Sequence, residues 1–390
     1  MKFPATFFLS LVIAISLTAS AQPPCNGRPI SSSANWPQFH SDPCHSGYNP
    51  YEFLLSPGTV GNLTMAWNYT MDNVMFSSPS VTRGVVYIGG GDASGSIYAF
   101  NANTGTLLWK SMVVNDMQLI SSPAVANGML YIGVSNNYTL YALNTSTGAQ
   151  VWSYTTGGYV GSSPSVVNGI VYFASWNDDH NVYALNARTG ALVWKYLMDA
   201  DHDIFASPAV ANGVVYMGGD KVYALDAASG TLLWKYPGVG LYYFSSATVA
   251  NGVVYVANGP DMDALNASNG QLLWQYQAGD YIEATPAVAN GVVYFGSYDH
   301  NIYALNASTG ALLWSYTTGQ GINSSPAVAN GVVYEASEDA NLYALNASTG
   351  ALLWKYTASN GFFSSPVVVN GMLFDASYDG NLYAFHLPGH

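Results

Sequence analysis

The chain has 390 residues, of which 8% are charged, and its formal net charge at pH 7 is −13. Its nine Lys and Arg residues are too few for the basic patch that nucleic-acid binding requires, which excludes that class of function. The length would suit roughly two or three domains, but an internal repeat favours one large domain.

The first 21 residues have the features of a secretory signal peptide. Lys2 precedes an apolar run over Phe7–Leu17, and an A-S-A motif at 19–21 forms a cleavage site. The apolar run is too short to cross a membrane, and no second apolar span follows. Cys25 follows Q-P-P rather than a small-residue box, so we expect no lipid anchor. The sequence predicts an exported protein, periplasmic or extracellular, without a membrane span.

Residues 22–58 form a predicted N-terminal extension that contains both cysteines of the chain, Cys25 and Cys44. An oxidising compartment favours an intrachain disulfide between them. Intermolecular pairing and two free thiols are the alternatives.

A tryptophan recurs along the rest of the chain at intervals of 40 to 43 residues. These residues are Trp67, Trp109, Trp152, Trp194, Trp234, Trp274, Trp314 and Trp354. A period of this length, made of short β-rich segments, is typical of a β-propeller. A feature present in every blade cannot mark one site, so these tryptophans are predicted to be packing residues.

Residues 284–316 show the elements of one blade. They contain four apolar runs, at Pro286–Ala289, Val292–Gly296, Ile302–Leu305 and Leu312–Tyr316, separated by turn residues such as N-G. The runs predict four antiparallel strands and an all-β fold.

The repeat predicts an eight-bladed propeller over residues 59–390. The motif of the first strand occurs eight times, and the last copy has no fourth strand after His386. Residues 63–69 resemble the missing strand, so the N-terminal strand is predicted to complete the last blade and leave no open edge.

The repeat A-x-N-x-x-T-G-x-L-x-W, with the S-S-P-x-V that follows it, resembles the quinoprotein-type (PQQ-like) β-propeller repeat. The resemblance covers the chain from about Trp36 onward. The family usually has Asp where this chain has Asn, and Asp226 alone keeps the acid. The resemblance implies either a dehydrogenase that carries pyrroloquinoline quinone (PQQ) and calcium, or a cofactor-free scaffold similar to the assembly factor of the outer-membrane β-barrel machinery.

The acids are concentrated on one predicted face. The turns after strands one and three of each blade are almost uncharged, and we name their side the neutral-turn face. The loops after strands two and four form the opposite side, the loop face, which carries fifteen of the 22 acids and one basic residue, Lys221. These acids are Asp72, Asp92, Asp116, Asp178, Asp179, Asp199, Asp201, Asp203, Asp220, Asp261, Asp280, Asp299, Glu338, Asp339 and Asp379.

The densest acidic stretch lies in the loop that enters the fourth blade, and the third blade contributes a second one. The candidate metal ligands are Asp178, Asp179, His180, Asp199, Asp201, His202 and Asp203. Carboxylates would suit Ca²⁺, and the two histidines a transition metal. Ile204 and Val210 replace the Gly and Glu of a calcium loop, so a solvated acidic loop is the alternative.

Two further deviations from the repeat lie on the same side. The residue after the aromatic of strand two is apolar in six blades but is Glu335 or Asp375 in the last two, which predicts either a polar pocket between blades seven and eight or a strand end that solvent reaches. The loops that enter strand one hold aromatic residues that would suit a sugar- or peptide-binding platform, with ordinary packing as the alternative. These are Tyr242, Tyr243, Phe244, Tyr281, Phe362 and Phe363.

No nucleophile–base–acid arrangement, phosphate loop or Cys/His metal spacing is present. The sequence therefore predicts a monomeric, non-catalytic scaffold whose protein or polysaccharide partner binds the acidic loop face. No cofactor is predicted, although Ca²⁺ is left open. The first alternative is a PQQ- and calcium-dependent dehydrogenase of alcohols or sugars, against which the acids of the loop face argue because PQQ carries three carboxylates. The second alternative is a carbohydrate-binding propeller.

Overall fold

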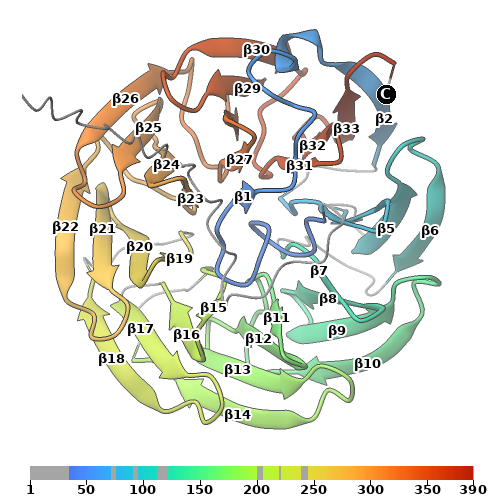
Figure 1. Cartoon of the computed structure of the whole chain (residues 1–390). Helices are drawn as coiled ribbons and strands as arrows, with labels where there is room; N and C mark the ends of the chain where they lie inside the picture. The colour runs from blue at the N-terminus through green and yellow to red at the C-terminus, as the bar shows by residue number, and fades with distance from the viewer. Residues whose placement is uncertain are drawn as a thin grey trace, which may run out of the picture.

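The computed structural model describes residues 35–71, 76–90, 95–112, 121–199, 205–218, 221–238 and 245–389. In these residues the strands form eight sheets, which follow one another in chain order around a single axis (Figure 1). The predicted all-β, eight-bladed propeller is therefore confirmed. The predicted signal peptide lies outside the described residues, and no helix within them is long and apolar enough to span a membrane.

Each of the first four blades has four antiparallel strands, of which the first lies nearest the axis. The first blade contains β3 (Ser80–Thr82), β4 (Val85–Gly89), β5 (Ser96–Asn101) and β6 (Leu107–Met112). The second contains β7 (Ala124–Ala126), β8 (Met129–Val134), β9 (Thr139–Asn144) and β10 (Gln150–Thr155). The third contains β11 (Ser165–Val167), β12 (Ile170–Ala174), β13 (Asn181–Asn186) and β14 (Leu192–Leu197). The fourth contains β15 (Ala209–Ala211), β16 (Val214–Met217), β17 (Lys221–Asp226) and β18 (Leu232–Pro237).

The last four blades repeat this plan. The fifth contains β19 (Thr248–Ala250), β20 (Val253–Asn258), β21 (Asp261–Asn266) and β22 (Leu272–Gln277). The sixth contains β23 (Ala287–Ala289), β24 (Val292–Gly296), β25 (Asn301–Asn306) and β26 (Leu312–Thr317). The seventh contains β27 (Ala327–Ala329), β28 (Val332–Ala336), β29 (Asn341–Asn346) and β30 (Leu352–Thr357). The eighth contains β31 (Val367–Val369), β32 (Met372–Ala376) and β33 (Asn381–His386), with β2 (Thr64–Thr70) as its outer strand.

The N-terminal strand closes the ring as the sequence predicts. β2 pairs antiparallel with β33, from Thr64 opposite His386 to Thr70 opposite Asn381. Ahead of it, η1 (Val60–Asn62) takes the place of the turn that the eighth blade lacks, because Trp354 Nε1 donates to the carbonyl of Leu63 at 3.1 Å. The two ends of the propeller are thus joined by backbone pairing.

Local sequence explains the hairpins within each blade. In the sixth blade, Asn290 and Gly291 have φ of +51° and +79°, which is the type I′ geometry that matches the twist of the flanking strands. Each S-S-P motif contributes to a closed ring of eight hydrogen bonds, 2.8 to 3.1 Å long, in which a backbone N–H donates to the Ser or Thr hydroxyl of the next blade. The repeated serines are therefore structural.

The repeated tryptophans lie at the seams between blades. Each of the eight indole N–H groups donates to a backbone carbonyl across a seam, at 2.8 to 3.1 Å. At seven seams the ring also packs on the glycine that ends the next blade's N-x-x-x-G turn, or D-x-x-x-G turn in the fourth blade; Gly310, for example, lies against Trp274. The predicted packing role of the tryptophans agrees with these contacts.

The Gly310→Ala variant should lower the free energy of unfolding by about 2 to 4 kcal/mol, because its Cβ would lie 2.7 Å from Trp274 and its φ is +70°. The matched control is Gly291→Ala, whose φ is +79° but whose Cβ would meet no atom within 4 Å. It should lose only about 1 kcal/mol, from backbone strain alone. Urea denaturation measures both, and equal losses would contradict the packing role of the seam glycine.

Residues 36–49, which we name the axial segment, lie at the centre of the ring (Figure 1). They contact the central residue of every inner strand with hydrogen bonds of 2.5 to 3.1 Å, the first from Val81 N–H to the Trp36 carbonyl and the last from Asn49 Nδ2 to the Val368 carbonyl. Within this segment, β1 (Tyr48–Asn49) pairs parallel with β27. The inner strands are sheet edges, and the axial segment satisfies backbone groups that would otherwise face the axis unpaired.

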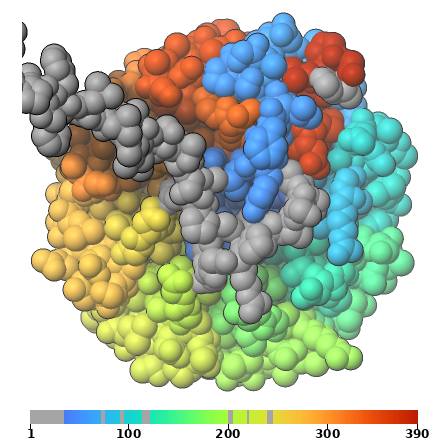
Figure 2. Space-filling view, in the orientation of Figure 1, coloured from blue at the N-terminus to red at the C-terminus, as the bar shows by residue number. Residues whose placement is uncertain are grey.

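The path of the axial segment was not predicted. From it the chain continues across the neutral-turn face, where Leu54 contacts Gly371 and Pro57 contacts Gly331. Figure 2 shows this part of the chain in blue, against the seventh and eighth blades in orange and red. Cys44 is buried within the segment. Cys25 lies outside the described residues, so the disulfide stays a prediction.

Candidate functional site

Several acids of the loop face have internal structural partners. Asp179, Asp299, Asp339 and Asp379 each accept a hydrogen bond from the tyrosine hydroxyl of the following strand, at 2.6 to 2.7 Å. All four also accept one from a backbone N–H of the preceding inter-blade loop. It comes from Gly157 in the case of Asp179 and is 2.6 to 3.2 Å long at the other three. These four carboxylates tie the loops together, so they are not a free acidic surface.

The candidate metal ligands are only partly described. Asp201, His202 and Asp203 lie outside the described residues, and Asp178 is exposed. Asp199 pairs with Lys235 at 2.8 Å and with Lys221 at 3.3 Å. The hydrogen bond from Lys235 holds the pKa of Asp199 well below its usual range. Across the described ranges, no three His, Cys, Asp or Glu side chains gather closely enough to hold a metal, and the metal hypothesis stays untested.

Glu335 and Asp375 are both fully buried, so solvent does not reach these side chains. The Ser324 hydroxyl donates to Glu335, and the Ser364 hydroxyl donates to Asp375. The second oxygen of each carboxyl group, Glu335 Oε2 and Asp375 Oδ2, has no hydrogen-bond partner. Burial raises the pKa of both groups well above its usual range, which favours the neutral acid.

Carboxylate and aromatic side chains meet on the loop face of blades six to eight and one. Tyr298 donates a hydrogen bond of 3.0 Å to Glu283, and Asn323 Nδ2 lies 3.0 Å from the Tyr298 hydroxyl and 3.3 Å from Glu283 Oε2. Glu338 acts electrostatically on both Glu283 and Tyr298. Burial raises the pKa of Glu283; the Tyr298 hydrogen bond opposes this effect and the charge of Glu338 adds to it.

Three aromatic rings continue this group toward the first blade. The ring centroids of Phe363 and Tyr378 are 4.3 Å apart, and Phe76 lies edge-on to Tyr378 at 5.0 Å. All three side chains are partly exposed, and the charge of Glu338 acts on Tyr378. We name this set the loop-face cluster: Phe76, Glu283, Tyr298, Asn323, Glu338, Phe363 and Tyr378.

The sequence indicated only part of this cluster. Of the predicted aromatic platform, Phe363 belongs to it, Tyr281 is 43% exposed nearby, and Phe362 is fully buried. Tyr242, Tyr243 and Phe244 lie outside the described residues. Glu283 and Asn323 were missed, although the residue before each S-S-P-like triplet varies from blade to blade, which could have marked this position.

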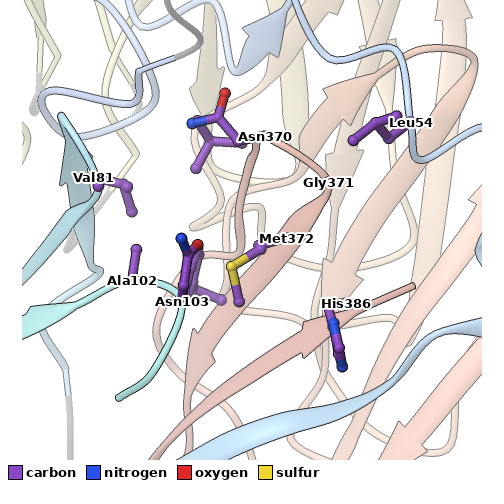
Figure 3. A pocket seen from close by; sticks show the side chains of 11 residues that line it. Leu54, Val81, Ala102, Asn103, Asn370, Gly371, Met372 and His386 are labelled. Carbon is purple, nitrogen blue, oxygen red and sulfur yellow. The ribbon is translucent and has the colours of Figure 1, made fainter. Parts of the chain in front are cut away.

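A second candidate site is a cavity of about 520 Å³ at the seam between the eighth and first blades, on the neutral-turn face (Figure 3). Phe374 lines this cavity. At the equivalent position of six other blades a tyrosine donates its hydroxyl to a backbone carbonyl of the next blade. Met372 adds apolar surface, and Asn103, Asn370 and His386 add polar groups. The lining holds no Asp, Glu, Lys or Arg, so the loop-face cluster offers the richer chemistry.

The comparison with protein families identifies the repeat. The family model described as outer membrane protein assembly factor BamB matches residues 93–240, 221–325 and 299–387. The chain belongs to this family. The BamB-type match confirms the resemblance to PQQ-like propellers that the repeat motif indicated. Among curated proteins no sequence matches.

Solved structures of two functional kinds share the fold of this BamB-family chain. A europium-containing methanol dehydrogenase is 13% identical, with a TM-score of 0.77 over 91% of this chain and 98% of its own. A quinohemoprotein alcohol dehydrogenase from Comamonas testosteroni is 16% identical, with a TM-score of 0.77 over 91% and 81%. BamB from Moraxella catarrhalis is 19% identical, with a TM-score of 0.69 over 84% and 98%. At these identities the likeness shows the fold alone.

Proposed function

We propose that this protein is an exported, non-catalytic propeller that binds a protein partner on its loop face. The observation that carries the proposal is the loop-face cluster, in which partly exposed aromatic rings and carboxylates from four blades lie together. The match to the family of an outer membrane protein assembly factor supports a protein partner. The chain that follows the axial segment crosses part of the neutral-turn face, which leaves the loop face as the variable surface.

A quinone-dependent dehydrogenase is the second candidate, because two of the structural neighbours are alcohol dehydrogenases. The described residues do not fit PQQ. On the loop face its three carboxylates would lie near Glu283 and Glu338. Lys221 pairs with Asp199, and Arg83 and Arg188 lie in turns of the neutral-turn face. Like charges without a matching cation disfavour such an anion.

The quinone hypothesis is tested by titration. Protein supplied with PQQ and Ca²⁺ should show no stoichiometric quinone spectrum and no reduction of an artificial dye with alcohols or aldoses. Stoichiometric binding with turnover would overturn the non-catalytic proposal.

The partner surface is tested by site-specific photo-crosslinking in the native host. A benzoylphenylalanine at position 281, where Tyr281 is 43% exposed on the loop face, should give a discrete crosslinked partner. The matched position is 308, where Ser308 is exposed in a turn of the neutral-turn face, and it should give none. A crosslink from position 308 alone would place the partner on the wrong face for this proposal.

A further inference from the structure

We propose that the loop-face cluster binds an ammonium group, and that a lysine side chain of the partner inserts there. This inference rests on the proposed function and names the chemistry of its site. It concerns the cluster residues Phe76, Glu283, Tyr298, Asn323, Glu338, Phe363 and Tyr378.

The aromatic half of the cluster consists of partly exposed rings that pack on one another. Phe363 and Tyr378 lie 4.3 Å apart with their planes inclined by 48°, and Phe76 stands at 89° to Tyr378. Because the rings contact one another, a ligand can reach only the π faces that they leave exposed. An ammonium group over such faces is attracted by the ring quadrupoles, and more strongly where water is excluded.

The carboxylate half lacks a countercharge. In the part of the chain that the structure describes, neither Glu283 nor Glu338 forms an ion pair with Lys or Arg. The Glu338 carboxylate accepts no hydrogen bond from a described residue, and the one opposite charge that acts on it is that of His300. Glu338 and Glu283 instead repel each other. A cation placed between them would relieve that repulsion.

Two buried acids are linked to the cluster through the serines that follow it in the chain. Ser324 and Ser364, which bond the buried acids Glu335 and Asp375, are the chain neighbours of the cluster residues Asn323 and Phe363. Each buried acid keeps one oxygen without a partner. The buried acids are neutral, so the negative charge of the site comes from Glu283 and Glu338, whereas its donors, Tyr298 and Asn323, are already engaged.

The negative charge of the site and its lack of free donors favour a cation over a sugar as the ligand. A neutral sugar ring could stack on Tyr378 and Phe363, but its approach would remove water from Glu283 and Glu338 without supplying charge. An ammonium group supplies both the charge and three donors. The cluster therefore fits a cationic ligand better than a polyol.

The test measures binding of Nα-acetyl-lysine amide to the full chain by NMR titration at low salt. Its control ligand is Nα-acetyl-norleucine amide, which has the same chain length without the ammonium group. We expect millimolar binding of the lysine compound alone. The Glu338→Gln and Tyr378→Ala variants should each weaken it about tenfold, whereas Tyr378→Phe should keep most of it.

The matched charge control is Asp178→Asn, which removes one exposed carboxylate from the same face in the third blade. It should leave binding unchanged within about a factor of two. Equal binding of the norleucine compound, or an equal loss in Asp178→Asn, would overturn the proposal. Binding of an oligosaccharide that Tyr378→Ala abolishes would replace it with a sugar platform. If Tyr378→Ala does not fold, Glu338→Gln still decides, because that carboxylate has no hydrogen bond from a described residue to lose.

Failure of this experiment is distinguishable from failure of the proposed function. A partner crosslinked from position 281 but no lysine binding would overturn the ammonium inference and leave the scaffold function standing. Quinone binding with turnover would overturn the scaffold function itself.

Discussion

Removal of residues 22–70 should abolish the cooperative unfolding transition of the propeller, not merely lower its midpoint. The deletion takes away β2, the outer strand of the eighth blade, and with it the pairing to β33. It also removes the axial segment, which bonds the inner strand of all eight blades. At about 1 kcal/mol for each hydrogen bond, the axial bonds alone approach the total stability of an ordinary domain. Thermal unfolding followed by circular dichroism measures the outcome, and an unchanged melting temperature would contradict the closure.

A rearranged chain separates the two contributions. Residues 60–70 can be moved behind Gly389 through a short linker, which restores β2 beside β33 but leaves residues 22–59 out. This variant should fold with a lower melting temperature than the full chain, because the last blade is closed while the inner strands still lack the axial segment. If it is as stable as the full chain, the axial segment does not stabilise the ring.

Acid should destabilise the protein through two histidines of the axial segment. Burial lowers the pKa of His40 to about 4, with its contacts to the His45 and Pro326 carbonyls offsetting only part of the effect. Burial and the nearby charge of His40 lower the pKa of His45 to about 3. Both groups have an ordinary pKa of 6.5, so the unfolded chain binds protons first as the pH falls. At about 1.4 kcal/mol per pKa unit, the fall from pH 6.5 to pH 3 removes about 3 kcal/mol of stability through His40 and about 5 kcal/mol through His45.

The carboxyl groups of Glu335 and Asp375 act in the opposite direction. Their pKa values are raised in the folded state by burial, so the stability that their protonation supplies is present at low pH and is lost as the pH rises. Urea denaturation from pH 3 to pH 9 should therefore give a maximum at intermediate pH. The His45→Gln variant should flatten the acid side of the curve of stability against pH. The control variant His300→Gln, at an exposed position, should not. An unchanged acid limb in His45→Gln would exclude the axial histidines as its cause.

The order of strands could be predicted because each blade is encoded locally. The predicted run Val292–Gly296 coincides with β24, and Leu312–Tyr316 falls within β26. Alternating apolar residues and N-G turns act over a few positions, so no knowledge of distant contacts is needed. The partnership of β2 with β33 could also be inferred, because a copy without a fourth strand needs one from elsewhere.

The site could be predicted only in part. Glu335 and Asp375 were marked because they break an apolar repeat position, and Phe363 because it lies in an inter-blade loop. Glu283 and Asn323, at the position before the S-S-P triplet, showed no chemical motif of their own.

The sequence by itself determined the number of blades, the identity of the seam residues and the closing strand, since these follow from a short-range pattern repeated at constant spacing. Only the tertiary structure decided what the variable positions do. The ring brings loops of neighbouring blades into contact, so Asp299 ties its loop to Gly279, 20 residues earlier. The Glu338 carboxylate, by contrast, accepts no hydrogen bond from a described residue. The ring also brings residues 36–49 beside all eight inner strands. The inner strands have unpaired backbone N–H and C=O groups at their edges, and a segment along the axis can form hydrogen bonds with all of them.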